Sequence, residues 1–329
     1  MGWEGHNKST SSRRTGWIEE CSEGLTEVEP LLRSTIGPPC PVDNLGFLTS
    51  LEGAKERLHF FHADLNEPDS FRAAIEGCRG VFHVAHPVGN TNEKPEEELT
   101  KMTVGGTLGI LKLCVDSKTV KRVVYTSSAA TVVYKGDGRQ VVDENTWSDI
   151  DLFRSMKTGA EAYMASKTKT EKAALEFAQK NGLDLFTVIP TLVVGPFLCP
   201  NLPVSVRMAL AMVLGSENHY RYLQGTSIVH VDDVASAHIF LFENPNAKAG
   251  RYICSYQELP LSELSAFLSS NYPDIKVPTA DSLKDIKGFN KSTCSSKKLL
   301  DSGFKFKYGL ESMFDGAIQS CKEKGHIPS

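Results

Sequence analysis

Short runs of apolar residues alternate along most of this chain with longer stretches in which apolar residues recur every three to four positions. The short runs are typical of buried strands, and the longer stretches are typical of helices that cover a core. Strands are predicted at 57–65, 80–85, 121–126, 183–189 and 251–254. Helices are predicted at 68–77, 96–117, 159–181, 204–215, 262–270 and 310–322, and another is entered at 229–234 and ends at 242. This alternation predicts an α/β fold with a Rossmann-like, doubly wound parallel sheet, in which ligands bind at the carboxyl ends of the strands.

The first 45 residues lack this alternation. Residues 1–14 are polar, and Pro38, Pro39 and Pro41 follow close together. Each proline fixes φ and removes a backbone donor. We therefore expect no strand in 1–45 and predict an atypical, poorly ordered segment there.

Composition and charge narrow the function classes. The chain has 329 residues and a formal net charge of −4, which argues against a general nucleic-acid binder. No apolar run approaches the roughly 20 residues of a membrane span, and no signal-peptide core is evident near the start, so a cytoplasmic protein is expected. The eight cysteines are scattered, which favours reduced thiols over a zinc knuckle or a disulfide scaffold.

A tyrosine and a lysine four residues apart lie in the predicted helix 159–181. Tyr163 and Lys167 fall on one helix face, and Ser128 follows an earlier strand. Such a trio can protonate a carbonyl oxygen while a hydride attacks the carbon, with Tyr163 as the acid and Ser128 as a second donor. An ammonium group favours the phenolate, so Lys167 is expected to lower the pKa of Tyr163 from its ordinary value of about 10.

The same spacing occurs at Tyr272 and Lys276, with Pro273 between them. Proline disfavours a helix there, so this pair is expected on the surface. A solvated helix face would also explain Tyr163 and Lys167, but the strand-end serine and the βαβ order favour a catalytic origin.

Other positions allow two interpretations each. Asp64, with Leu65 beside it, follows a strand and could bond an adenine or cap a helix. Val84 and Ala85 could let a cofactor approach the backbone or simply end a buried strand. His230 is interpreted as a core histidine at a helix entry rather than a metal ligand, and no metal site is predicted.

Six stretches, 60–65, 80–85, 125–129, 163–167, 189–196 and 229–233, together resemble the plant branch of extended short-chain dehydrogenases/reductases. The group is the one that contains dihydroflavonol 4-reductase, anthocyanidin reductase and vestitone reductase, and 46–71 is similar to vestitone-reductase-like members. The resemblance spans 47–328 and implies NADPH-dependent reduction of a ketone on a flavonoid-like or other phenylpropanoid substrate. It assigns catalysis to Ser128, Tyr163 and Lys167. It places around the cofactor Asp64, Leu65, Val84, Ala85, Thr126, Ser127, Tyr163, Lys167, Pro190 and Val193.

The chain departs from this family in three ways. The family opens with a strand and a G-x-x-G-x-x-G turn that holds the pyrophosphate at a helix N-terminus, and no such turn occurs here. The first βαβ unit is therefore interpreted as missing or replaced. No Lys or Arg lies between Arg33 and Lys55, where the family carries basic residues near the adenosine 2′-phosphate. Both departures predict impaired NADP(H) binding.

The third departure concerns the substrate. Among the expected substrate-binding residues Ser128, Val133, Tyr163 and Ser227, dihydroflavonol reductases carry Asn at the position of Val133 and Gln at that of Ser227. A dihydroflavonol substrate is therefore less expected than another ketone.

These considerations predict an NAD(P)-binding Rossmann-like region at 46–195. They also predict a mainly substrate-binding region at 196–329, some segments of which return to the core. Two alternatives to an active reductase remain: a non-enzymatic remnant without cofactor binding, and a less favoured NAD-dependent epimerase or dehydratase. A small-molecule substrate is the expected partner, and the sequence is compatible with a monomer.

Overall fold

A four-stranded parallel sheet forms the centre of the computed structural model, which describes residues 31–36, 45–87, 95–136, 140–289 and 291–328. The strands are β3 (Gly80–His83), β4 (Arg122–Thr126), β6 (Asp184–Pro190) and β9 (Gly250–Cys254), in the order β3-β4-β6-β9. Their near-continuous apolar runs fit a parallel sheet that is covered on both faces. The predicted α/β, Rossmann-like fold is confirmed, and each of these strands lies within one residue or two of its predicted bounds.

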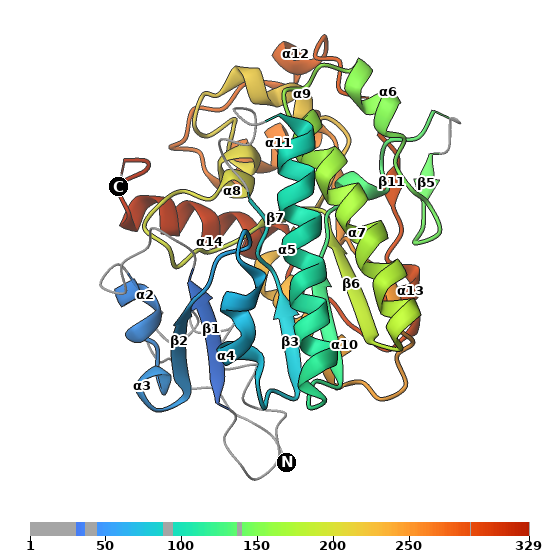
Figure 1. The fold of residues 1–329 in the computed structure, drawn as a ribbon. Coiled ribbons are helices and arrows are strands. Elements are labelled where there is room, and N and C mark those ends of the chain that lie inside the picture. Colours follow the sequence, from blue (N-terminus) through green and yellow to red (C-terminus); the bar gives the residue numbers. More distant parts are fainter. Residues whose placement is uncertain (1–30, 37–44, 88–94, 137–139, 290, 329) are drawn as a thin grey trace.

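Helices cover the two faces of this sheet. On one face lie α5 (Glu96–Ser117) and α7 (Glu161–Asn181), which run side by side in Figure 1, and α10 (Val231–Glu243) covers the other. Side chains of β4 alternate between the faces: Tyr125 packs with the α5 and α7 residues, and Val124 packs with the α10 residues. The acidic first turn of α5 complements the helix dipole, and Lys118 ends the helix in the left-handed conformation at φ 59°.

A second, two-stranded parallel sheet pairs β1 (Leu32–Ile36) with β2 (Leu58–His62). The prediction of no strand within 1–45 is therefore wrong for Leu32–Ile36. The segment is polar, but its burial alternates along the strand and ends at the buried Ile36. The charge of Arg33 is satisfied by the carbonyl oxygens of Ala73 and Glu76, at 3.2 and 2.5 Å from its Nη1. An alternating pattern of period two forms a strand even where few residues are apolar.

Among the described strands, β1 pairs only with β2, and neither joins the four-stranded sheet. Figure 1 shows this pair beside β3, with α4 (Arg72–Ile75) in front. The structure does not confirm that the first βαβ unit is missing. The expectation for residues 1–30 and 37–44 lies outside the described residues, and the predicted domain boundaries stay a prediction.

The C-terminal half adds a mixed three-stranded sheet made of β7 (Leu192–Val194), β8 (Thr226–His230) and β10 (Gln257–Leu259). The order is β10-β8-β7, and β8 is antiparallel to β10 and parallel to β7. Strand β8 was not predicted, because its apolar end at 229–230 reads as the entry to α10. The predicted helix 204–215 ends at Ala209, after which the backbone turns with Ala211 N donating to Met208 O. The remaining elements are α2 (Gly46–Thr49), α3 (Ala54–Arg57), η3 (Pro68–Phe71), η5 (Ala129–Thr131), β5 (Val141–Val142), α6 (Ile150–Ser155), α8 (Val204–Ala209), η6 (Glu217–His219), α9 (Tyr220–Leu223), α11 (Leu261–Asn271), α12 (Ala280–Leu283), β11 (Thr293–Cys294), α13 (Lys297–Asp301) and α14 (Leu310–Glu323).

In the ranges that the structure describes, no helix combines the length and the apolar character that crossing a membrane requires.

Candidate active site

The carboxyl ends of β3, β4 and β6 lie at one edge of the sheet because these strands are parallel neighbours. After β4 the chain continues in extended form to Ser128, whose side chain accepts a hydrogen bond from Ala130 N at 3.2 Å and so caps η5. A strand end followed by a capped turn fixes the position of this serine.

Helix α7 brings the predicted tyrosine and lysine to the same edge. The helix ends at Gly182 in the left-handed conformation, with φ 65°, which a glycine adopts without steric cost. Tyr163 and Lys167 are one turn apart near its start, and the face that carries Lys167 is buried. In the rival pair, Lys276 is exposed as predicted, whereas Tyr272, at the end of α11, is half-buried against the core of the C-terminal half.

The side chain of Ser128 lies close enough to Tyr163 to influence its pKa. Burial raises the pKa of Tyr163 above its ordinary value, and the nearby Ser128 side chain lowers it by less. The net shift is opposite to the one predicted from the neighbouring ammonium group, because desolvation of the phenolate outweighs the effect of Ser128. A raised pKa keeps the phenol protonated and able to donate at neutral pH.

Lys167 is buried, with an exposed fraction of 3%, and its Nζ donates to Thr126 O at 2.9 Å. Burial lowers the pKa of Lys167 to about 7, while the negative charge of Glu171 acts in the opposite direction. A lysine with such a pKa loses its proton near neutrality, so its charge is adjustable in the working pH range.

His86, just beyond β3, is a neighbour of Tyr163 that sequence reasoning did not identify. The two rings meet edge to face with centroids 5.5 Å apart, and His86 Nε2 lies 3.2 Å from Ser166 Oγ. Since Ser166 Oγ donates to Tyr163 O, it accepts from the histidine, whose Nε2 carries the proton. Burial, with a smaller effect of the Lys167 charge, lowers the pKa of His86 to about 2, so the ring is neutral. The signal in the sequence that could have identified His86 is its position just after a predicted strand.

The residues predicted to lie around the cofactor fall into three groups. Val84 and Ala85 are exposed beyond β3, and Pro190 ends β6. Val193 lies in β7, half-buried. Thr191, which lies between Pro190 and Val193 in the chain, is buried, and its hydroxyl has no hydrogen-bond partner among the described residues. An unpartnered buried hydroxyl at the carboxyl end of a central strand fits a polar ligand group.

Asp64 and Leu65 belong to the second group, on the β2 side. Asp64 Oδ1 accepts from Asn66 N at 2.9 Å, which is a turn-stabilising bond. Leu65 packs against α5 at Gly106. The side chain of Asp64 thus stabilises a local turn. This is similar to the helix cap that was one of the two interpretations of Asp64, although the bond stabilises a turn and not the start of a helix.

Thr126 and Ser127 form the third group, and both hydroxyls point into the protein. Thr126 Oγ1 lies 2.7 Å from His238 Nε2, and Ser127 Oγ donates to Glu171 Oε2 at 2.7 Å. Their placement is that of structural supports behind Ser128.

Val133 and Ser227, the two predicted substrate positions outside the trio, are both buried. Val133 packs with Tyr134 and Phe153, and Ser227 lies in β8 beside Glu258 of β10. Their contact with substrate stays a prediction.

His230 has the predicted structural role. Its Nδ1 accepts from Asp232 N at 3.0 Å at the start of α10, and its ring stacks on Tyr308 with centroids 4.2 Å apart. Over the part of the chain with described coordinates, no group of His, Cys, Asp and Glu side chains could hold a metal ion.

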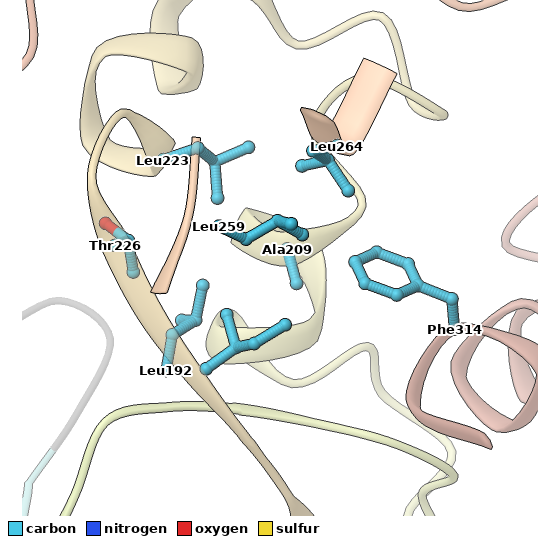
Figure 2. Close-up of a pocket in the computed structure, with 8 residues that line it drawn as sticks. Leu192, Ala209, Leu223, Thr226, Leu259, Leu264 and Phe314 are labelled. Atoms are coloured by element: carbon cyan, nitrogen blue, oxygen red, sulfur yellow. The ribbon is translucent and has the colours of Figure 1, made fainter. Parts of the chain in front are cut away.

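The C-terminal half holds an apolar cavity of about 10 Å³, near the lower limit for one water molecule. Figure 2 shows the side chains that line it. It is a packing gap of that core, and none of the trio lines it. Its lining residues are Leu192, Ala209, Leu223, Thr226, Ile228, Leu259, Leu264 and Phe314.

Comparison with known proteins agrees with this geometry. Residues 42–254 match a family model described as the NAD dependent epimerase/dehydratase family. A vestitone reductase of Medicago sativa is 52% identical over 284 residues, which are 86% of each protein. A dihydroflavonol 4-reductase of Callistephus chinensis is 46% identical over 304 residues, which are 92% of this chain and 83% of the relative. The crystal structure of the alfalfa vestitone reductase matches with a TM-score of 0.82 at 50% identity, over 90% of this chain and 92% of that one.

Proposed function

This chain belongs to the NAD dependent epimerase/dehydratase family, and from that premise we propose that it is an NADPH-dependent reductase of a ketone on a flavonoid-like or other phenylpropanoid small molecule. The observation that carries the proposal is that the Ser128 side chain lies close to Tyr163 at the sheet edge, with Lys167 one helical turn further on. Its relatives, a vestitone reductase and dihydroflavonol 4-reductases, are named for the reduction of such molecules.

Each member of the trio has a distinct role in this reaction. Tyr163 donates the proton that the carbonyl oxygen takes up, and Ser128 donates a second hydrogen bond to that oxygen as negative charge develops. The Lys167 ammonium stabilises the phenolate that Tyr163 becomes. When bound, the nicotinamide supplies the hydride that attacks the carbonyl carbon.

The chain's own residues support binding of the nicotinamide half of the cofactor. Val84, Ala85 and Pro190 surround the strand ends, and the unpartnered Thr191 hydroxyl offers a polar contact there. The phosphate half has less support, because the sequence contains no glycine-rich turn of the family's pattern. The absence of this sequence pattern is the observation that favours the alternative, a remnant that keeps the fold without binding cofactor.

The proposal includes a cytoplasmic location, and it leaves the ketone to be identified. Val133 and Ser227 are the positions at which we propose that the substrate is distinguished from a dihydroflavonol.

The test is a titration of the purified full-length chain with NADPH and NADH, followed by thermal unfolding, and then an assay of ketone reduction. A cofactor that binds the folded state adds about 2.7 kcal/mol at one hundred times its Kd. A rise in Tm with NADPH, together with consumption of NADPH during reduction of a flavonoid-like ketone, supports the reductase. A chain whose Tm does not respond to either cofactor is the remnant, and turnover of a nucleotide sugar in place of a ketone indicates the epimerase or dehydratase.

A further inference from the structure

Behind the trio lies a buried ion pair that the proposed chemistry does not use. Glu171 of α7 is completely buried, and Arg251 of β9 has an exposed fraction of 7%. We propose that Glu171, held by Arg251, is a positioning residue of the active site: it fixes the segment that carries Ser128 against α7, and it is the counter-charge of Lys167. This inference rests on the proposed reductase function.

Helix geometry places the three residues in one row. Tyr163, Lys167 and Glu171 follow one another at intervals of four residues on α7, so their side chains lie on one face of the helix. The row runs from the acid at the sheet edge to the buried carboxylate. The contacts that fix Glu171 therefore also fix the position of Tyr163 along the axis of α7 and its orientation around that axis.

Both carboxylate oxygens of Glu171 are fully used. Oε1 accepts from Thr187 Oγ1 at 2.6 Å and from Arg251 Nε at 3.0 Å. Oε2 accepts from Ser127 Oγ at 2.7 Å and from Arg251 Nη2 at 3.2 Å. One side chain thus joins α7 to β6, to β9 and to the residue that follows β4, with the two-pronged guanidinium geometry that fixes orientation as well as distance.

Arg251 extends the contacts to the other side of Ser128. Its Nη2 donates to Thr131 Oγ1 at 3.0 Å, in η5. Its Nη1 donates to Glu144 O at 2.8 Å and to Thr146 O at 2.5 Å, in the loop after β5. All five hydrogen bonds that the guanidinium of Arg251 can donate are therefore made, and they compensate for the loss of hydration of its buried charge.

Ser128 is consequently held from both directions. Ser127, which precedes it, is bonded to Glu171, and Thr131, three residues later, is bonded to Arg251. Lys167 Nζ adds a bond to Thr126 O at 2.9 Å. Ser128 and Tyr163 therefore lie on two segments that one ion pair fixes, and a displacement of about 1 Å at such a site can reduce the rate a hundredfold.

Glu171 is also the source of negative charge at Lys167. The titratable groups around that ammonium are His83 and His86 near the end of β3, Tyr125 of β4, and Tyr163 and Glu171 of α7. Both histidines have lowered pKa values and are neutral, and burial raises the pKa of both tyrosines, so they are neutral too. Only Glu171 opposes the loss of the Lys167 proton that burial favours.

The test compares Glu171→Gln, which keeps the shape and removes the charge, with Glu171→Asp, which keeps the charge and shortens the reach. Glu176→Gln is the matched control, because Glu176 lies on the exposed side of α7 and pairs with Lys180 at the surface. Two properties are measured: kcat against pH, and the titration midpoint of Lys167 from the NMR signals of its ε-carbon, assigned with Lys167→Arg.

We expect Glu171→Gln to lower the Lys167 midpoint by about one pH unit and to reduce kcat roughly tenfold to a hundredfold. Glu171→Asp should reduce kcat while largely keeping the midpoint, and Glu176→Gln should change neither. If Glu171→Gln does not fold, Ser127→Ala removes only the link to the Ser128 segment and should reduce kcat without moving the midpoint.

A Glu171→Gln variant that is less stable but has wild-type kcat and an unmoved midpoint would overturn the proposal, as would a Ser127→Ala variant with wild-type kcat. The midpoint is measured without substrate or cofactor. If the wild type does not reduce ketones and the midpoint still moves, then the reductase assignment fails while the electrostatic role of Glu171 stands.

Discussion

His86 meets the ring of Tyr163 edge to face, with centroids 5.5 Å apart at an interplanar angle of 87°. Through Ser166 the same histidine is hydrogen-bonded to the helix turn that carries the tyrosine. The end of β3 is thereby connected to the proposed acid. His86 orients the phenol from a second side, in addition to Ser128.

Replacing His86 with Ala removes both contacts. Edge-to-face pairs contribute about 0.5–1.5 kcal/mol, and a loosened proton donor costs further rate, so we expect kcat to fall roughly tenfold. His86→Phe keeps an aromatic ring and should lose less. Steady-state kinetics of the two variants at one pH checks this, and an equal loss in both would contradict a role for the ring contact.

Removing the hydroxyl of Tyr163 should abolish proton donation without unfolding the protein. We expect Tyr163→Phe to reduce kcat by about a hundredfold to ten-thousandfold, with cofactor binding retained in a thermal-shift titration. Tyr272→Phe is the matched control, since Tyr272 has the same spacing to a lysine and bonds Asp315 at the surface. Wild-type turnover in the Tyr163 variant would rule out this acid.

Lys167 makes the stability of the protein depend on pH. Its pKa is about 7 in the folded state and about 10.5 in the unfolded chain. Between these two pH values the unfolded state binds more protons than the folded state, so Lys167 increases the free energy of unfolding as the pH rises. Below pH 7 the lysine is charged in both states, and the destabilisation caused by burying that charge is fully present.

Compared with Lys167→Met, the wild type should therefore gain about 3 kcal/mol of relative stability from about pH 7 to pH 10. Urea denaturation of both proteins across this range measures the difference. The pKa values of His83 and His86, about 3 and 2, exclude these histidines as the cause of a change in that window. A constant difference across the range would mean that Lys167 is charged throughout.

Two adjacent glycines of α5 should respond in opposite directions to alanine. A Cβ on Gly106 would lie 2.7 Å from the backbone oxygen of Leu65, whereas a Cβ on Gly105 meets nothing within 4 Å. We expect Gly106→Ala to destabilise the fold by about 1–3 kcal/mol and Gly105→Ala to stabilise it by about 0.5–1 kcal/mol. Thermal unfolding of the pair provides the measurement, and similar Tm values would show that Leu65 moves without cost.

Sequence pattern was sufficient for the core of the fold. The predicted helix 96–117 coincides with α5, Glu96–Ser117, because acidic residues mark its start and its apolar spacing persists to the end. Strand β1 was missed because Arg33 and the nearby prolines obscured a short alternating pattern. A strand this polar depends on its partner β2, and pairing between distant segments is not visible in local sequence.

The trio was also predictable, since the distance between Tyr163 and Lys167 along a helix and the strand-end place of Ser128 are local properties. The direction of the Tyr163 pKa shift was not, because desolvation depends on the whole fold. Glu171 was missed for a related reason. A charged residue on a helix normally faces solvent, and its burial becomes intelligible only once Arg251, eighty residues later, is brought against it.

The Arg251 guanidinium lies over the ring of Trp147, with Cζ 3.6 Å from the ring centroid, and Lys172 Nζ lies 4.9 Å from the same centroid. It is the only tryptophan in the ranges that the structure describes. An indole excited state is quenched and shifted in colour by charges at this range, so the emission of Trp147 depends on the charge beside it. Trp147, one of the three tryptophans of the chain, is thus a spectroscopic probe at the place where mutation of the ion pair would be felt.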